Sequence, residues 1–373
     1  MISAIEIAQA LASNGGKLIL PTDEQRAIIE STHMGPTVII AGAGSGKTET
    51  MSQRVLWLVA NGIISPSEIL GLTFTRKAAG ELSQRIRKRL KQLRKAGLIP
   101  LGGEANIAPD ITVDVSTYHS YAGRILVEHG IRIGIDADIE PLGEAAAWQL
   151  ANQVVNSFAE VDYGIFHKPT HIVEAVLNLS SEIAEHNQSV ESIRAGLLSH
   201  LEDFQKIASG SNDETRSAIE VMQERLAILP MVERIDAHRL EHGDLTFNDQ
   251  MSYAAKLVEQ VPEIGVIEKT KYKVVLLDEY QDTSYSQVRF LSSLFGNGHA
   301  VTAVGDPNQA IYGWRGASTQ TLETFAEHFG GDCKTFDLLT TWRNDKRILE
   351  FANNVIGSSS ASVKPLVPRS TAG

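Results

Sequence analysis

The chain has 373 residues, a length that predicts roughly two to three domains at ~100–200 residues per domain. Hydrophobic residues make up 43%, which is typical of a globular protein and excludes a disordered chain. No apolar run approaches the ~18 residues of a membrane helix, and the N-terminus lacks a signal-peptide pattern, so we expect a cytoplasmic protein with no membrane partner. The single cysteine, Cys333, excludes an internal disulfide and a cysteine-based zinc cluster.

The net charge of −11 hides a strongly basic segment. Residues Arg76–Lys95 contain nine basic residues and one acid, Glu81, which gives this segment a charge of +8. Attraction to phosphate acts over a Debye length of ~8–10 Å, so one basic strip is able to bind a polyanion on an acidic protein. Leucine and isoleucine recur at helical spacing between residues 82 and 93, which predicts one amphipathic helix. On charge alone, a nucleic-acid surface and a solvated helix face are equally good interpretations.

Short strands and helices alternate in the predicted element order. A β-branched run at Thr37–Ala41 precedes a glycine-rich turn and a helix that ends at Asn61–Gly62. Four further apolar runs predict strands, at Ile69–Phe74, Ile111–Thr117, Val274–Leu277 and Ala300–Val304. Continuous apolar runs suit a parallel sheet that is covered on both faces. The expected fold class is therefore α/β.

Helical periodicity replaces the strand pattern from about Tyr121 to Gln250. Helices are predicted at Glu144–Phe158, His171–Glu185, Val190–Ile207 and Thr215–Leu229. Strand character returns at Tyr272, so a helical insertion divides the sheet-forming domain into two pieces of sequence. We expect the sheet domain at residues 1–120 and 251–335, the insertion at residues 121–250, and the start of another core domain at residues 336–373.

Residues Ala41–Thr48 fit the Walker A pattern of a phosphate-binding loop, with alanine at the first glycine position. Its small residues let backbone N–H groups wrap a phosphate; they are Ala43, Gly44, Ser45 and Gly46. Lys47 is placed to reach the β- and γ-phosphates, and the Thr48 hydroxyl is placed to ligate Mg²⁺. The pattern predicts ATP and Mg²⁺ as cofactors.

Two adjacent acids, Asp278 and Glu279, follow the predicted strand Val274–Leu277. At the strand's C-terminal end Asp278 is expected to hold the metal, and Glu279 to orient and deprotonate an attacking water. Two ionised carboxylates at one site are costly without a cation. An isolated Asp-Glu pair at a strand end could simply lie on the surface, but the Walker A loop in the same chain favours a metal site.

The segments Asp278–Thr283 and Val304–Ala317 closely resemble signature motifs of the UvrD/Rep/PcrA group of superfamily 1 DNA helicases. Three other segments are similar to earlier motifs of this group and occur in the same order: Leu20–Arg26, Leu72–Ala79 and Thr117–Ser120. The resemblance implies a RecA-like P-loop core domain interrupted by a mainly helical insertion. It also implies single-stranded DNA and duplex junctions as partners, 3′ to 5′ movement, and DNA repair as the setting.

The resemblance also assigns roles at the nucleotide site. It implies that Gln25 reads adenine, that Gln309 senses the γ-phosphate, and that Arg343 acts as an arginine finger. Trp342 stands where the family usually has a tyrosine that stacks on adenine, and the indole should still stack.

For DNA, the resemblance implies contacts by residues of several motifs. These are Thr73, Phe74, Arg76, Lys77, Tyr118, His119, Tyr312, Trp314 and Arg315. Stacking of aromatic rings on bases is independent of base identity, as a motor that reads every sequence requires. Core packing is the alternative for the aromatic residues, and Tyr312 is also suited to buttress Phe74.

The chain ends 30 residues after Arg343, whereas a further RecA-like domain needs ~100 residues or more. We therefore expect the N-terminal portion of a longer helicase. This portion should bind Mg-nucleotide, hydrolyse it very slowly and not separate strands. The leading interpretation is an ATP-dependent DNA helicase. The alternative is a non-motor ATP- and DNA-binding regulatory module on a helicase scaffold.

Overall fold

The computed structural model describes residues 1–13, 18–99, 112–136, 142–158, 168–207, 213–313, 320–357 and 364–369. These residues group into two compact units. The first unit comprises Met1–Tyr121, Pro262–Thr283 and Leu291–Gly373, and the second comprises Ala122–Val261 and Ser284–Phe290. The first unit is therefore assembled from three separate stretches of sequence.

A six-stranded parallel sheet forms the centre of the first unit, with the strand order β3-β2-β4-β5-β1-β6. Its strands are β1 (Thr37–Ala41), β2 (Ile69–Thr73), β3 (Asp114–Thr117), β4 (Val274–Leu277), β5 (Val301–Gly305) and β6 (Lys334–Leu338). Strands β2, β4 and β5 are buried at every position, as continuous apolar runs in a parallel sheet should be. The α/β, RecA-like fold class that the sequence predicted is confirmed.

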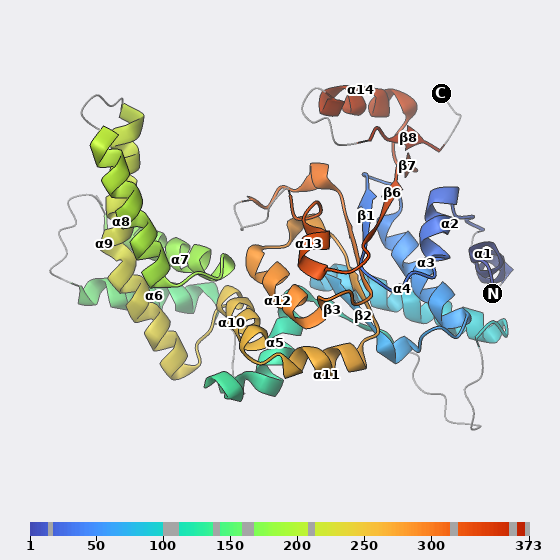
Figure 1. Cartoon of the computed structure of the whole chain (residues 1–373), viewed down its shortest axis with the longest axis horizontal. Coiled ribbons are helices and arrows are strands. Elements are labelled where there is room, and N and C mark those ends of the chain that lie inside the picture. The colour runs from blue at the N-terminus through green and yellow to red at the C-terminus, as the bar shows by residue number, and fades with distance from the viewer. Residues whose placement is uncertain are drawn as a thin grey trace. The chain divides into compact units, whose positions relative to one another are not determined.

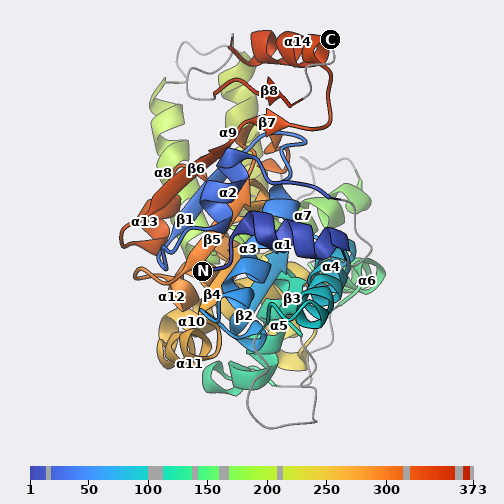
Figure 2. The same cartoon turned by 90° about the vertical axis from the view of Figure 1, so that its right-hand side faces the viewer.

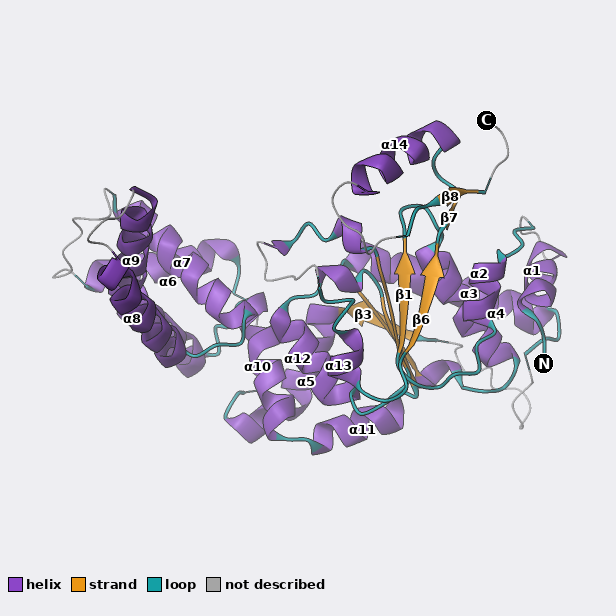
Figure 3. Ribbon diagram, turned by 45° about the horizontal axis from the view of Figure 1, so that its top comes forward, coloured by secondary structure: helices purple, strands orange, loops and turns teal. Residues whose placement is uncertain are grey.

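Helices cover both faces of this sheet (Figure 3). They include α1 (Ala4–Ser13), α2 (Asp23–Ile29), α3 (Lys47–Ala60), α4 (Arg76–Lys95), α11 (Glu263–Lys271) and α13 (Phe325–Phe329). Helices α2, α3 and α4 lie on one side of the sheet and α13 on the other (Figure 1), and α1 to α4 share the face turned to the viewer in Figure 2. The apolar side of α4, from Leu82 to Leu93, packs into the same core as α3. The amphipathic helix predicted for the basic segment is confirmed.

Short elements complete the first unit. They are the 3-10 helices η1 (Pro66–Glu68), η5 (Tyr280–Asp282) and η6 (Pro307–Gln309), the helix α14 (Lys346–Gly357), and a parallel pair of two-residue strands, β7 (Thr340–Thr341) and β8 (Val367–Pro368). Strand β6 pairs with β1 and runs to Leu338, past the domain boundary expected at residue 335. The helices α5 (Tyr118–His129) and α12 (Tyr285–Phe295) contain residues of both units.

The described part of the second unit is helical. It contains η2 (Gly130–Ile133), α6 (Glu144–Ser157), α7 (Pro169–Glu185), α8 (Val190–Ile207), α9 (Asp213–His242) and α10 (Phe247–Gln260). The helix predicted to end at Leu229 instead continues through Pro230 to His242. The residues on both sides of this proline, from Ile228 to Val232, are buried in the core of the unit. Their burial offsets the hydrogen bond that proline removes from a helix. No described helix combines the length and hydropathy that a membrane span requires.

Candidate functional site

The C-terminal ends of the strands meet at one edge of the sheet, where ligands bind in open α/β folds. Strand β1 ends at Ala41, immediately before the glycine-rich loop. Strand β4 ends at Leu277, before the two acids, and the neighbouring strand β5 ends at Gly305. The sheet order therefore brings three separate motifs of the sequence to one edge.

The loop after β1 has a conformation and a packing that suit small residues. Gly44 and Gly46 have φ angles of 76° and 85°, in the left-handed region that favours glycine. A Cβ atom on Gly44 would lie 2.5 Å from the Cβ of Arg343, so a larger residue would not fit. The Ser45 hydroxyl is buried and has no hydrogen-bond partner among the described residues. Helix α3 begins at Lys47, so the positive end of its dipole adds to the attraction for an anion.

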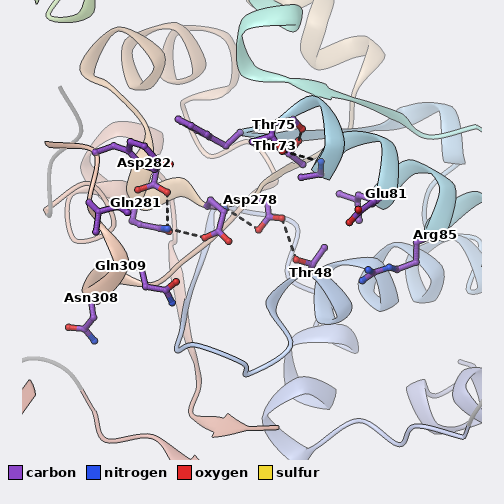
Figure 4. Close-up of a pocket in the computed structure, with 16 residues that line it drawn as sticks. Thr48, Thr73, Thr75, Glu81, Arg85, Asp278, Gln281, Asp282, Asn308 and Gln309 are labelled. Atoms are coloured by element: carbon purple, nitrogen blue, oxygen red, sulfur yellow. Dashed lines mark hydrogen bonds between the residues drawn. The ribbon is translucent and has the colours of Figure 1, made fainter. Parts of the chain in front are cut away.

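The predicted phosphate, metal and base residues converge beside this loop. Lys47 Nζ donates to Glu279 Oε2 at 3.1 Å, and Thr48 Oγ1 donates to Asp278 Oδ2 at 3.5 Å. Figure 4 shows the Thr48 and Asp278 side chains pointing toward each other. Oxygen ligands of this kind suit Mg²⁺, which usually takes one or two carboxylates together with phosphate and water oxygens. Among the described residues no group of three or more His, Cys, Asp or Glu is placed to hold a metal by itself. A metal shared with a bound phosphate therefore fits these residues.

The acids carry an electrostatic strain that a cation would relieve. Burial, followed by the neighbouring Glu279 carboxylate, raises the pKa of Asp278 to about 6, while Lys47 opposes the change. Burial and Glu279 likewise raise the pKa of Asp282 to about 6. Desolvation and like charges disfavour the ionised carboxylates. A divalent cation stabilises the ionised form and so lowers the pKa of both acids.

Gln281 connects the Glu279 carboxylate to the end of β5. Its Nε2 donates to Glu279 Oε2 at 2.9 Å, and its Oε1 accepts a hydrogen bond from the backbone N–H of Asp306 at 3.1 Å. A Cβ atom on Gly305 would lie 2.4 Å from Gln281 Oε1, so this contact requires glycine. Sequence reasoning did not single out Gln281, although it lies within a motif that was identified.

Gln309, the predicted γ-phosphate sensor, lies at the same edge. Its Nε2 donates to Asp306 Oδ2, and Asp306 Oδ1 accepts from the backbone N–H of Asn308 at 3.0 Å. The same carboxylate thus fixes both Gln309 and the turn that carries it. Gln309 lines a pocket together with Thr48 and Asp278.

Gln25 supports the phosphate loop from the side. It forms a capping box with Thr22 at the start of α2, and its Nε2 donates to the carbonyl of Ser45 at 3.1 Å. Its Oε1 accepts from the backbone N–H of Thr22 at 3.0 Å. Both ends of the carboxamide are engaged within this chain, so the predicted reading of adenine stays a prediction.

The segment after β6 crosses the phosphate loop. The Thr341 hydroxyl donates to the carbonyl of Ala43 at 2.9 Å, and the backbone N–H of Trp342 donates to the carbonyl of Gly44 at 3.0 Å. The Trp342 side chain is 42% exposed, and the Arg369 guanidinium lies 3.3 Å from the centroid of its indole. This exposed aromatic ring therefore lies at the rim of the loop, next to Arg343.

A pocket of about 510 Å³ extends from the acids to the predicted strand-contacting residues. Phe74 and Tyr312 form part of its wall, and their rings stack with centroids 5.2 Å apart and an interplanar angle of 28°. The Thr73 hydroxyl donates to the carbonyl of Thr75 at 3.1 Å, which shapes the turn that leads into α4. The remaining lining residues are Thr48, Ala78, Glu81, Leu82, Arg85, Asp278, Glu279, Gln281, Asp282, Asn308, Gln309 and Ile311. The structure therefore brings residues predicted for the nucleotide and residues predicted for the DNA strand to one cavity.

The other predicted DNA contacts have different outcomes. Arg76 and Lys77 are exposed at the start of α4, and His119 is half-buried. Tyr118 is buried, and its hydroxyl donates to the carbonyl of Asp278 at 2.9 Å. The structure does not present Tyr118 to a ligand; the ring supports the end of β4 instead. Trp314 and Arg315 lie outside the described residues.

The parallel sheet, with a glycine-rich loop after β1 and paired acids after β4, places the chain in the α/β, RecA-like class. The chain belongs to the family described as the UvrD/REP helicase N-terminal domain, whose profile matches residues 21–330. It is 31% identical over 340 residues to an "ATP-dependent DNA helicase PcrA" of Staphylococcus epidermidis. A relative with the same description from Staphylococcus aureus is 30% identical over 340 residues. Each match covers 90% of this chain and 40% of the relative, so the chain spans about 40% of the length of these curated relatives.

Proposed function

We propose that this chain is the ATP- and DNA-binding part of an ATP-dependent DNA helicase. The observation that carries the proposal is one cavity that joins Thr48, Asp278 and Glu279 to the stacked pair Phe74 and Tyr312. A motor of this class needs hydrolysis and strand contact to be coupled, and a shared cavity provides a short path for that coupling. Family membership and the similarity to the PcrA helicases support the same conclusion.

At the nucleotide site, the chain's residues have distinct proposed tasks. The phosphate loop and Lys47 bind the phosphates, while Thr48 and Asp278 hold Mg²⁺, which when bound neutralises charge on the phosphates. Glu279 orients the attacking water and takes its proton. Gln309 and Arg343 stabilise the charge that develops on the transferred group, and Gln25 and Trp342 contact adenine.

At the strand site, single-stranded DNA passes the cavity and stacks a base against Phe74 and Tyr312, while Arg76 and Lys77 contact phosphates. Stacking of this kind is worth ~1–3 kcal/mol per base. We further propose 3′ to 5′ movement, with duplex junctions as substrates. In this proposal residues 121–250 form the inserted domain, and the two compact units support that organisation.

Mg-ATP binding and hydrolysis test the nucleotide assignments separately. Lys47→Ala should weaken nucleotide binding, because it removes the cation that meets the phosphates. Glu279→Gln should retain binding and lower hydrolysis by ~100-fold or more, because the amide cannot accept the proton. Equilibrium binding of a fluorescent ATP analogue and single-turnover hydrolysis with and without single-stranded DNA measure the two effects. Hydrolysis by Glu279→Gln at the wild-type rate would exclude Glu279 as the base.

The alternative is a regulatory module that binds ATP and DNA without moving. A motor requires that DNA binding stimulate hydrolysis and that bound nucleotide change the affinity for DNA. A module would show both binding activities without any coupling between them.

A further inference from the structure

The basic side chains of helix α4 include arginines that face α3 and lysines that face solvent. Arg85 and Arg89 turn toward α3, where both pair with Glu49. Arg89 Nη1 lies 2.8 Å from Glu49 Oε1, and Arg85 Nη1 lies 3.7 Å from Glu49 Oε2. Arg89 Nη1 also donates to the Ser52 hydroxyl at 3.2 Å. These two arginines therefore connect α4 to α3, and Arg85 also lines the pocket described above.

The opposite face of α4 carries a row of exposed lysines, namely Lys77, Lys88, Lys91 and Lys95. Their spacing places them on one side of the helix, away from the buried leucines. At 1.5 Å per residue the row is about 27 Å long. Glu81 is the only acid of the helix. Lys88, Lys91 and Lys95 therefore form a positive surface on a chain whose net charge is −11, whereas Glu81 interrupts the row between Lys77 and Lys88.

Several exposed cations of this chain pair with an acid three or four residues away. Lys206 pairs with Asp203, Arg216 with Asp213 and Lys346 with Glu350. No such acidic partner lies within ion-pair distance of Lys88, Lys91 or Lys95 in the part of the chain that the structure describes. A helix face that is merely solvated usually mixes both signs of charge. The absence of compensating acids favours a face that meets an external polyanion.

The composition of α4 indicates which form of nucleic acid suits this face. Surfaces that bind single strands combine cations with aromatic rings on which bases stack. Helix α4 contains no Phe, Tyr or Trp. A duplex, in contrast, presents only its phosphates to a contact of this kind and keeps its bases stacked inside. We propose that Lys88, Lys91 and Lys95 bind the phosphate backbone of duplex DNA, on a surface separate from the strand site at Phe74. This inference rests on the proposed function, because it takes DNA to be the substrate.

The salt dependence of duplex binding tests the inference. The variant Lys88→Gln/Lys91→Gln/Lys95→Gln removes the three charges, and glutamine has nearly the helix propensity of lysine. Each phosphate contact on B-DNA contributes about 0.9 to the slope of log affinity against log salt. Loss of three contacts should therefore reduce the slope by about 2.7 and weaken duplex binding at low salt by at least tenfold. Fluorescence anisotropy with a labelled blunt duplex and a labelled single strand, over a series of salt concentrations, measures both quantities.

A matched control carries the same change in net charge. Lys206→Gln/Lys334→Gln/Lys346→Gln removes three exposed lysines from α8, β6 and α14, and its slope on duplex should stay at the wild-type value. A wild-type slope in the α4 variant, with melting temperature and single-strand binding intact, would overturn the inference and leave the proposed function in place. A slope that falls on single strands alone would also overturn it, since the ligand of α4 would then be a single strand. Wild-type protein that binds neither DNA would instead contradict the proposed function.

Discussion

Glu279, the proposed catalytic base, is held in place by a few single-residue contacts. Its backbone has φ 49° and ψ 44°, a left-handed conformation that costs of order 1–3 kcal/mol for a residue with a Cβ. Two donors, Lys47 and Gln281, meet the same carboxylate oxygen, at 3.1 and 2.9 Å. The strained backbone therefore lies at the residue whose carboxylate these two donors hold.

Gln281 is expected to act as a positioning residue for Glu279. The variant Gln281→Glu keeps the acceptor for the backbone N–H of Asp306 but loses the donor to Glu279 and adds a like charge. We expect single-turnover hydrolysis to fall by ~10- to 100-fold, because small misplacements of a catalytic group are costly. The affinity for Mg-nucleotide should change by less, and fluorescent-analogue titration measures it. A variant with the wild-type hydrolysis rate would show that Lys47 alone orients the base.

Substitutions of Phe74 test the proposed strand site. Phe74→Ala should weaken binding of single-stranded DNA by ~1–3 kcal/mol, because it removes a stacking platform. Phe74→Leu retains apolar volume without an aromatic face and should recover little of the loss. The salt slope should stay unchanged in both variants, because neither carries a phosphate contact. Anisotropy titrations with a short labelled oligonucleotide measure the effect, and full binding by Phe74→Ala would indicate that the ring serves packing alone.

The site residues that could be predicted from the sequence share one property, which is that each belongs to a local sequence pattern. Lys47 and Thr48 follow a glycine-rich turn, and Asp278 and Glu279 follow an apolar strand, so their chemistry can be inferred from neighbours in sequence. The contact between Gln281 and Asp306 depends on β4 lying next to β5, which no local pattern specifies. The same reason explains why the inward position of Tyr118 was not predicted.

At the level of elements, burial decided which predictions succeeded. Helix α4 was predicted because its apolar residues recur at helical spacing from Leu82 to Leu93. Strand β6 was not predicted, because it lies at the edge of the sheet and is largely exposed, so its apolar signal is weak. Helix α9 was predicted to stop before Pro230, although the local rule against proline is outweighed there by buried neighbours on both sides.

Glu24 links helix α2 to the segment that follows β6. Its Oε2 accepts hydrogen bonds from the backbone N–H groups of Leu339 and Thr340, at 3.0 and 3.1 Å. Glu24→Ala should lower stability by ~1–3 kcal/mol, because both donors lose a charged acceptor. Glu24→Gln retains an acceptor and should lose less. Urea unfolding measures the difference, and Trp342 fluorescence reports whether the segment over the phosphate loop has moved. Equal stability in all three proteins would show that water replaces the carboxylate.

On the scale of the whole molecule, each of the two units has its own apolar core. The second unit also contains a buried polar cluster between its helices. Arg239 is almost fully buried, and its Nη1 donates to Asp249 Oδ2 at 3.2 Å and to the Ser180 hydroxyl at 3.0 Å. The Ser180 hydroxyl in turn donates to Asp236 Oδ1 at 3.3 Å. One guanidinium thus serves two carboxylates, which leaves negative charge incompletely compensated.

This imbalance predicts a pH-dependent stability for the second unit. Burial, followed by the Asp249 carboxylate, raises the pKa of Asp236 to about 6 from an ordinary value of 3.8, against the opposing effect of Arg239. The folded state therefore holds the proton more tightly than the unfolded state, so the contribution of Asp236 to stability is present below pH 3.8 and is lost as the pH rises through about 6. Asp236→Asn stays neutral, so its melting temperature should exceed that of the wild type by a few degrees at about pH 7.5, and by less at about pH 4.5. The exposed Asp203, which pairs with Lys206, provides a surface control through the variant Asp203→Asn. Thermal unfolding followed by circular dichroism measures all three proteins, and an equal difference for Asp236→Asn at both pH values would contradict the raised pKa.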